Sequence, residues 1–238
     1  MNSRFSGEMQ GEQAVASFLD ENFYGLIKSA SFEREPKEGL QHAGVDLKCH
    51  RDREVLYIDE KAALYYMDRD IPTFAFELSF LNRFEDVRVG WFLNDALKTT
   101  HYLLIWITTN RPPEKGKKHT IKPSSLHKKD IKKLECLFLS RDELKKRLEE
   151  NGLSSVVLKE KANSLRANGK EGREYITGQS LFYYFASSPK KYKEAPINLI
   201  IKKELLKDVP GTRHYEVLVG KYRCLDRFSQ KGESKDFP

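Results

Sequence analysis

The sequence predicts an α/β protein in which a mixed central sheet is flanked by helices, and three observations support this fold class. Residues 8–23 begin the pattern, because Val15, Phe18 and Leu19 recur at the spacing of one helix face. Short apolar segments follow, separated by charged turns or turns that contain Pro and Gly. Residues 101–108 are almost continuously apolar, as expected of a central strand buried on both faces.

The other elements are predicted in chain order from the same periodicities. Residues 73–80 alternate between apolar and more polar side chains, which is typical of a strand. Ser140 and Glu143 form a capping box that begins a helix, and Gly152 ends it after residue 151. Residues 83–97 are expected to end in a helix that leads into the strand at 101–108. Further strands are expected at 26–32, 44–48, 55–61, 134–139, 156–158, 180–185, 197–201 and 214–219.

Charged residues end the second of two neighbouring strands, Val55–Lys61, and the first strand contains Gly44-Val45-Asp46. Because side chains alternate along a strand, Asp59 and Lys61 are expected to share one face, with Glu60 on the other. Asp46 precedes Asp59 by thirteen residues, a separation that a hairpin closes. Two carboxylates and an ammonium would then converge, and two carboxylates suit Mg²⁺ (or Mn²⁺) that keeps water and phosphate ligands. The alternative is a hairpin whose charged side chains face solvent.

Gly44-Val45-Asp46 followed by Ile58-Asp59-Glu60-Lys61 resembles the motif of the PD-(D/E)XK nuclease superfamily. The resemblance implies a restriction-endonuclease-like core and Mg²⁺-dependent hydrolysis of phosphodiester bonds. Asp46 and Asp59 match the two acidic metal-binding positions, and Lys61 matches the catalytic lysine. Val45 stands where the motif has proline, and many members also lack that proline.

A third carboxylate has two candidates. Glu12 lies on the first predicted helix, where members of the resembled superfamily often place a glutamate that reaches the metal. Glu77 lies in the middle of the strand at 73–80, on its less apolar face. Either residue has a structural alternative: Glu12 as a solvated acid near a helix start, and Glu77 as an ordinary strand residue.

The chain carries a net charge of +7 that is unevenly distributed. Residues 1–110 contain 12 Lys and Arg against 18 Asp and Glu, whereas residues 111–238 contain 30 against 17. Such asymmetry is typical of nucleic-acid-binding proteins, although lysine-rich surfaces are also common elsewhere. Residues 111–133 form a predicted basic loop that would contact the phosphate backbone, or else stay solvated. The candidate residues are Lys115, Lys117, Lys118, Lys122, Lys128 and Lys129.

Length and composition limit the remaining possibilities. With 238 residues, 39% of them hydrophobic, the chain is expected to form a core at 1–152 and a basic β-rich extension at 153–238 that packs on it. No apolar run is long enough for a membrane span, so no membrane association is expected. Cys49, Cys136 and Cys224 are far apart and form no CxxC pair, which favours a reduced, cytoplasmic setting.

The hypothesis that joins these observations is a metal-dependent endonuclease acting on DNA, of restriction or repair type, and a homodimer if it cuts both strands. Aromatic residues 182–185 beside lysines would also suit nucleic acid, although a plain strand explains them. One alternative is a non-catalytic nucleic-acid-binding protein with the same fold. Another is a structural or interaction domain in which Asp46–Lys61 is a surface ion pair.

Overall fold

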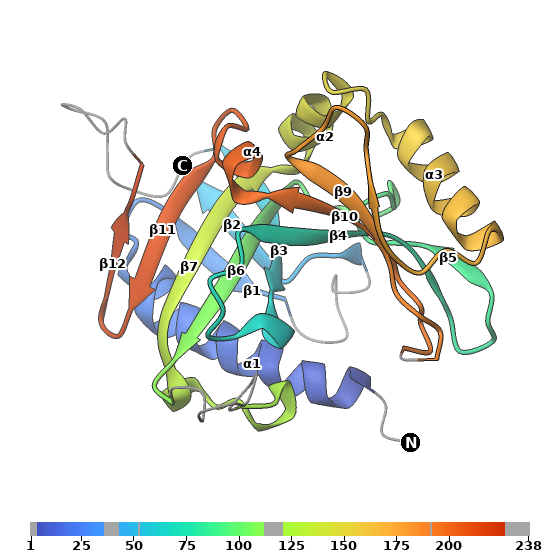
Figure 1. Ribbon diagram of the computed structural model, residues 1–238. Helices are drawn as coiled ribbons and strands as arrows, with labels where there is room; N and C mark the ends of the chain where they lie inside the picture. Colours follow the sequence, from blue (N-terminus) through green and yellow to red (C-terminus); the bar gives the residue numbers. More distant parts are fainter. Residues whose placement is uncertain (1–3, 36–42, 52, 112–120, 191, 227–238) are drawn as a thin grey trace.

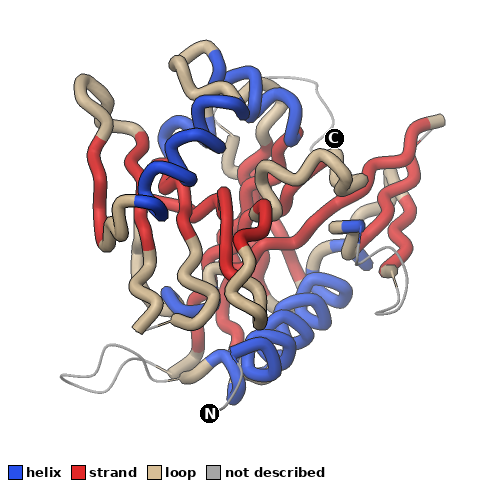
Figure 2. The backbone as a smooth tube through the Cα atoms, turned by 90° about the vertical axis from the view of Figure 1, so that its right-hand side faces the viewer, coloured by secondary structure: helices blue, strands red, loops and turns tan. Residues whose placement is uncertain are grey.

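The computed structural model describes residues 4–35, 43–51, 53–111, 121–190 and 192–226. Helix α1 (Arg4–Asn22) lies against one face of a seven-stranded sheet. The other face of that sheet packs on a five-stranded sheet, which helices α2 (Arg141–Glu149) and α3 (Ser155–Ala167) cover (Figures 1 and 2). The predicted α/β class with a mixed sheet is therefore confirmed, but helix α1 covers only one face of that sheet, and a second sheet, which was not predicted, covers the other face.

The seven-stranded sheet is mixed, as predicted. Its strands follow the order β1-β2-β3-β6-β7-β11-β12; β3 and β6 run parallel, and the other neighbours are antiparallel. Strand β6 is central and buried on both faces, which confirms the prediction made from its apolar sequence. The strands are β1 (Ser31–Arg34), β2 (Leu47–Arg51), β3 (Glu54–Ala62), β6 (His101–Thr109), β7 (Ile131–Ser140), β11 (Arg213–Leu218) and β12 (Lys221–Cys224).

The five-stranded sheet is antiparallel throughout, in the order β5-β4-β10-β9-β8. Phe74, Phe76 and Leu78 of β4 face the core between the two sheets, in agreement with the predicted alternation. The strands are β4 (Thr73–Leu81), β5 (Val87–Val89), β8 (Gly172–Tyr175), β9 (Phe182–Ala186) and β10 (Ile197–Lys202).

Short helical elements connect the strands. The 3-10 turn η1 (Tyr24–Leu26) follows α1, so the first strand begins later than predicted, at Ser31. Ser140 accepts a hydrogen bond from the backbone N–H of Glu143, so it caps α2 as predicted. The remaining elements are η3 (Leu64–Tyr66), η4 (Pro123–Ser125), η5 (Lys128–Asp130) and α4 (Lys203–Lys207).

Two sequence predictions were wrong. Residues 156–158 lie in α3 and not in a strand, because Leu158, Ala162 and Leu165 repeat at helical spacing and are buried, while Val156 stays exposed. Residues 83–97 contain β5 and turns and no helix. Gly90 marks the reason for this second error, because the chain turns there in close contact with β4 and does not continue into a helix. A Cβ at position 90 would lie only 2.3 Å from the carbonyl oxygen of Glu77.

Both sheets combine strands from either side of residue 152. Strand β4 pairs with β10, and β7 pairs with β11. The segment after residue 152 is thus hydrogen-bonded to the segment before it. Within the described residues, no helix has the length and apolar character that crossing a membrane requires.

Candidate active site

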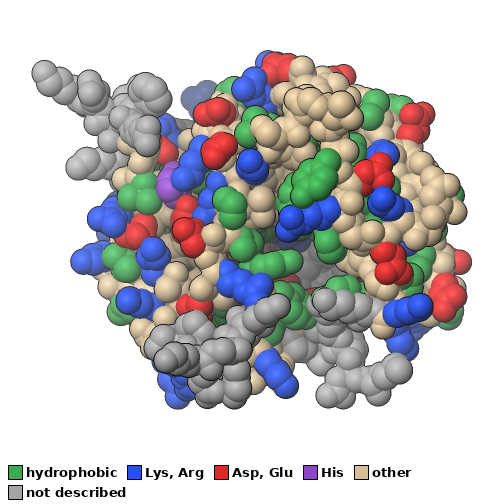
Figure 3. Space-filling model, in the orientation of Figure 1, with side chains coloured by type: hydrophobic (Ala, Val, Ile, Leu, Met, Phe, Trp, Pro, Cys, Tyr) green, Lys and Arg blue, Asp and Glu red, His purple; other side chains and the backbone are tan. Residues whose placement is uncertain are grey.

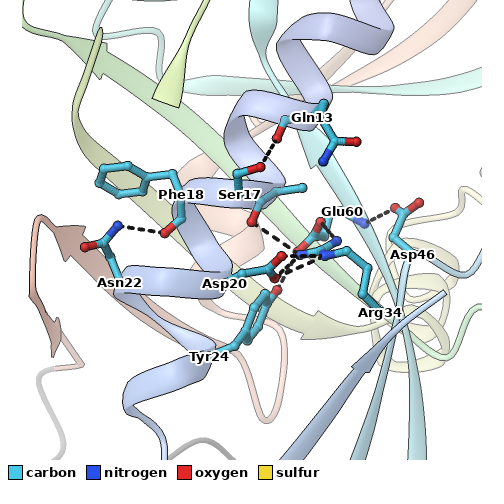
Figure 4. Close-up of polar contacts among 10 residues, drawn as sticks. Gln13, Ser17, Phe18, Asp20, Asn22, Tyr24, Arg34, Asp46 and Glu60 are labelled. Atoms are coloured by element: carbon cyan, nitrogen blue, oxygen red, sulfur yellow. Dashed lines mark hydrogen bonds and ion pairs between the residues drawn. The ribbon is translucent and has the colours of Figure 1, made fainter. Parts of the chain in front are cut away.

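The hairpin of β2 and β3 fixes Asp46 against β3. The N–H of Asp46 donates to the carbonyl of Ile58 (2.9 Å), and its Oδ2 accepts the N–H of Glu60 (2.8 Å; Figure 4). Gly44 allows this approach, because it has a φ of +72° and lies so close to Thr99 that a Cβ would be 2.8 Å from the hydroxyl oxygen. Two hydrogen bonds and a glycine turn therefore hold the carboxyl group in place.

Asp59 and Lys61 share one face of β3, as strand alternation predicts. Lys61 Nζ lies 2.7 Å from Asp59 Oδ1, and the ammonium lies 5.1 Å from the ring centre of Trp91. The Asp59 side chain is only 3% exposed. Its second oxygen, Oδ2, is buried and accepts no hydrogen bond from the described residues in this arrangement, and the Asp46 carboxyl, whose pKa is raised, lies within hydrogen-bond reach of the Asp59 carboxyl. A buried carboxylate oxygen without a donor is costly, which makes it a candidate cation ligand.

The charges of this group interact strongly. Burial and the neighbouring Asp59 carboxyl raise the pKa of Asp46 to about 6. Burial alone would lower the pKa of Lys61, but Asp59 and Asp46 outweigh it and raise that pKa. Lys61 is therefore an ammonium at neutral pH. The pair of adjacent carboxyls is a site of excess negative charge that a cation would relieve.

Glu60 points to the opposite face, as predicted. Its carboxylate accepts hydrogen bonds from Tyr24 Oη (2.7 Å) and Arg34 Nη1 (2.8 Å), and Arg34 also pairs with Asp20 of α1 (Figure 4). This network lies between α1 and the seven-stranded sheet. Glu60 thus joins the helix to the sheet and lies outside the Asp46–Asp59–Lys61 group.

Both candidates for the third carboxylate lie within electrostatic range of Lys61. The Glu12 side chain is exposed at the surface. Partial burial by the surrounding protein nevertheless raises its pKa, and the positive charge of Lys61 opposes this shift. Burial also raises the pKa of Glu77, opposed by Lys61 and by the N–H of Trp91. Figure 3 shows a hollow near the middle of this face, in the region of β3 and β4, with Lys and Arg side chains on its border. Among the described residues, no three His, Cys, Asp or Glu side chains group closely enough to hold a metal ion.

The apolar run of residues 90–93 predicts core packing, with a place for Trp91 at the rim of the site as the alternative. Phe92 is indeed buried, but the Trp91 ring faces the Lys61 ammonium. Gly90 lets the chain pass against Glu77. The sequence signal for a place beside Lys61 was the Gly90-Trp91 pair, which directly follows the exposed residues 87–89. Hydrophobic periodicity does not identify such a position.

The predicted basic loop lies partly outside the described residues, and Lys115, Lys117 and Lys118 are among those not described. Lys122, Lys128 and Lys129 are exposed, and Lys128 forms an ion pair with Glu21 of α1. These lysines remain candidates for phosphate contacts. No family model, curated protein or solved structure matches this chain.

Proposed function

We propose that this protein is a metal-dependent nuclease that hydrolyses phosphodiester bonds in DNA. One observation carries the proposal: Asp46 and Asp59 place two carboxyls side by side with the Lys61 ammonium, and one buried oxygen of Asp59 accepts no hydrogen bond from the described residues. The same residues carry the sequence resemblance to PD-(D/E)XK nucleases. Local geometry and motif thus favour the same chemistry.

The donor set fits a hard divalent cation such as Mg²⁺ or Mn²⁺. Asp46 and Asp59 would hold it, and water and phosphate oxygens would complete its shell, since Mg²⁺ commonly takes only one or two protein carboxylates. When bound, the ion supplies acidification of a water molecule and stabilisation of negative charge on the phosphate. Glu12 or Glu77 would add negative charge near the ion, since each lies within electrostatic range of Lys61.

Lys61 has a defined electrostatic role in this proposal. Its raised pKa keeps it protonated, so it acts as a positive charge and a hydrogen-bond donor and not as a general base. Asp59 holds the ammonium by the 2.7 Å ion pair, and the Trp91 ring packs against it. These contacts support a role for the ammonium in orienting the attacking water or neutralising charge on the phosphate.

The decisive experiment is plasmid cleavage with Mg²⁺ or Mn²⁺. We expect wild type to cut, and Asp59→Ala and Lys61→Ala to lose about 100-fold or more of the rate. Glu54→Ala is the matched control, because Glu54 is an exposed acid on the same strand. It should cleave like wild type, and circular dichroism should show that all variants fold.

Two outcomes would contradict the proposal. Cleavage that persists at full rate in Asp59→Ala would remove the assigned site. Absence of cleavage by wild type across DNA and RNA substrates, with salt-dependent retention on DNA, would favour a non-catalytic nucleic-acid-binding protein instead.

A further inference from the structure

The five-stranded sheet has one face packed against α2, α3 and the seven-stranded sheet, and on its other face the described side chains are partly or fully exposed. In Figure 1, α2 and α3 lie above the sheet, and the amino-terminal end of α1 lies below it. The strand register places Tyr175, Tyr183, Ile200 and Ala75 in one row across β8, β9, β10 and β4, on the face away from the helices. Tyr175 is 68% exposed on the edge strand β8.

An arginine side chain contacts these tyrosines. The Arg173 guanidinium lies 5.3 Å from the ring centre of Tyr183, and its Nη1 donates to the Tyr175 hydroxyl at 3.4 Å. The two tyrosine rings are 5.6 Å apart. We name Arg173, Tyr175 and Tyr183 the aromatic platform.

The register also connects the platform to the candidate active site. The next row across the sheet is Arg173, Phe185, Asn198 and Glu77, where Glu77 is a candidate third carboxylate. Neighbouring strands are about 4.8 Å apart, so β9 lies roughly 10 Å and β8 roughly 14 Å from the strand of Glu77. Figure 3 shows hydrophobic and basic side chains next to one another along the upper border of the central hollow. A few nucleotides would span this distance.

We propose that the aromatic platform binds unpaired nucleotides of the strand that enters the active site, so that the substrate is single-stranded or contains a single-stranded segment. This inference rests on the proposed nuclease function. Exposed aromatic rings offer stacking to any base whose face is open, and the adjacent guanidinium group suits phosphates. Bases inside a duplex are already stacked on their neighbours, so a duplex would gain only the contacts to phosphate.

Binding is tested without cleavage, by fluorescence anisotropy of a labelled thymidine oligonucleotide and a blunt duplex in EDTA. We expect wild type to bind the single strand more tightly. Tyr175→Ala and Tyr183→Ala should each weaken that binding by about fivefold or more, and Tyr175→Phe should retain it because the ring remains. Phe84→Ala is the matched control: Phe84 is 69% exposed, stacks with Arg83 at 4.6 Å, and lies at the opposite edge of the sheet.

The outcomes separate this inference from the nuclease proposal. Equal affinity for both substrates, or wild-type affinity in Tyr175→Ala, would overturn the platform even if Mg²⁺-dependent cleavage is seen. Tyrosine-dependent binding of the single strand with no cleavage under any condition would support the platform and overturn the nuclease. Because the Tyr183 ring is partly buried, thermal unfolding of the Tyr183→Ala variant is measured as well. An unfolding temperature close to that of wild type would show that weaker binding does not result from loss of the fold.

Discussion

Because side chains alternate along β3, Glu60 and its neighbours Asp59 and Lys61 point to opposite faces of the strand and have different surroundings. The side chain of Glu60 is 8% exposed and is held by Arg34 and Tyr24, whereas Asp59 and Lys61 turn toward the candidate active site. Burial raises the pKa of Glu60, and the charge of Arg34 opposes this shift. A carboxylate in this position therefore depends on its arginine partner to remain charged.

Replacement of Glu60 by alanine should destabilise the fold. The change leaves Arg34 and the Tyr24 hydroxyl without their buried acceptor, so we expect a loss of about 3 kcal/mol in the free energy of unfolding. Urea denaturation measures it. Glu33→Ala is the control, because the Glu33 side chain is 64% exposed and should cost no more than about 0.5 kcal/mol. A Glu60→Ala protein as stable as the control would show that this network contributes nothing.

The connection from β4 to β6 depends on how closely β5 and Gly90 approach β4. The N–H of Gly90 donates to the carbonyl of Leu78, and the N–H of Phe92 donates to that of Glu77. Any side chain at position 90 must displace the backbone at Glu77. The same turn sets the position of Trp91 beside Lys61.

Substitution of Gly90 by alanine should therefore affect both stability and the site. We expect a loss of about 1–3 kcal/mol from the steric conflict and a lower cleavage rate in the protein that remains folded. The matched substitution is Gly152→Ala, where a Cβ meets nothing within 4 Å and the cost arises from the φ of +78° alone. If Gly90→Ala kept full activity and stability, the close approach would have no functional consequence.

The sequence predicted those elements whose signal is local. The β2–β3 hairpin and the facing of Asp59 and Lys61 follow from alternation, and the cap of α2 follows from Ser140 and Glu143. The strand expected at 156–158 was wrong because three apolar residues do not distinguish a strand from a helix turn. The neighbours of Lys61 depend on tertiary packing between β3, β4 and α1, and periodicity carries no information about that packing.

At the scale of the molecule, Glu135 joins three separate segments. It lies on β7, with Lys203 Nζ of α4 at 2.6 Å and His214 Nε2 of β11 at 3.0 Å. Lys203 also stacks 4.2 Å from the ring centre of Trp106. Burial alone would raise the pKa of Glu135, but these two partners lower it to about 2.

The lowered pKa predicts how stability depends on pH. The unfolded chain takes up this proton near pH 4.5 and the folded chain near pH 2, so the unfolded state binds more protons between these values. The contribution of Glu135, at most about 3 kcal/mol, is complete above pH 4.5 and is lost as pH falls through this window. Glu135→Gln should therefore show a smaller fall in the free energy of unfolding between pH 6 and about pH 3. An unchanged slope in urea titrations would contradict this.

The pairing of β4 with β10 also determines when the proposed active site is complete during synthesis. Asp46, Asp59 and Lys61 belong to a hairpin whose β2–β3 pairing is local, and β3 gains its second neighbour, β6, about forty residues later. Strand β4, which carries Glu77, has only β5 as a neighbour until β10 emerges late in translation. Pairings so distant along the chain form slowly. A nascent or truncated chain that ends before β10 would thus contain Asp46, Asp59 and Lys61 but would lack the strand that pairs with β4, so the proposed activity would require the carboxy-terminal third of the chain.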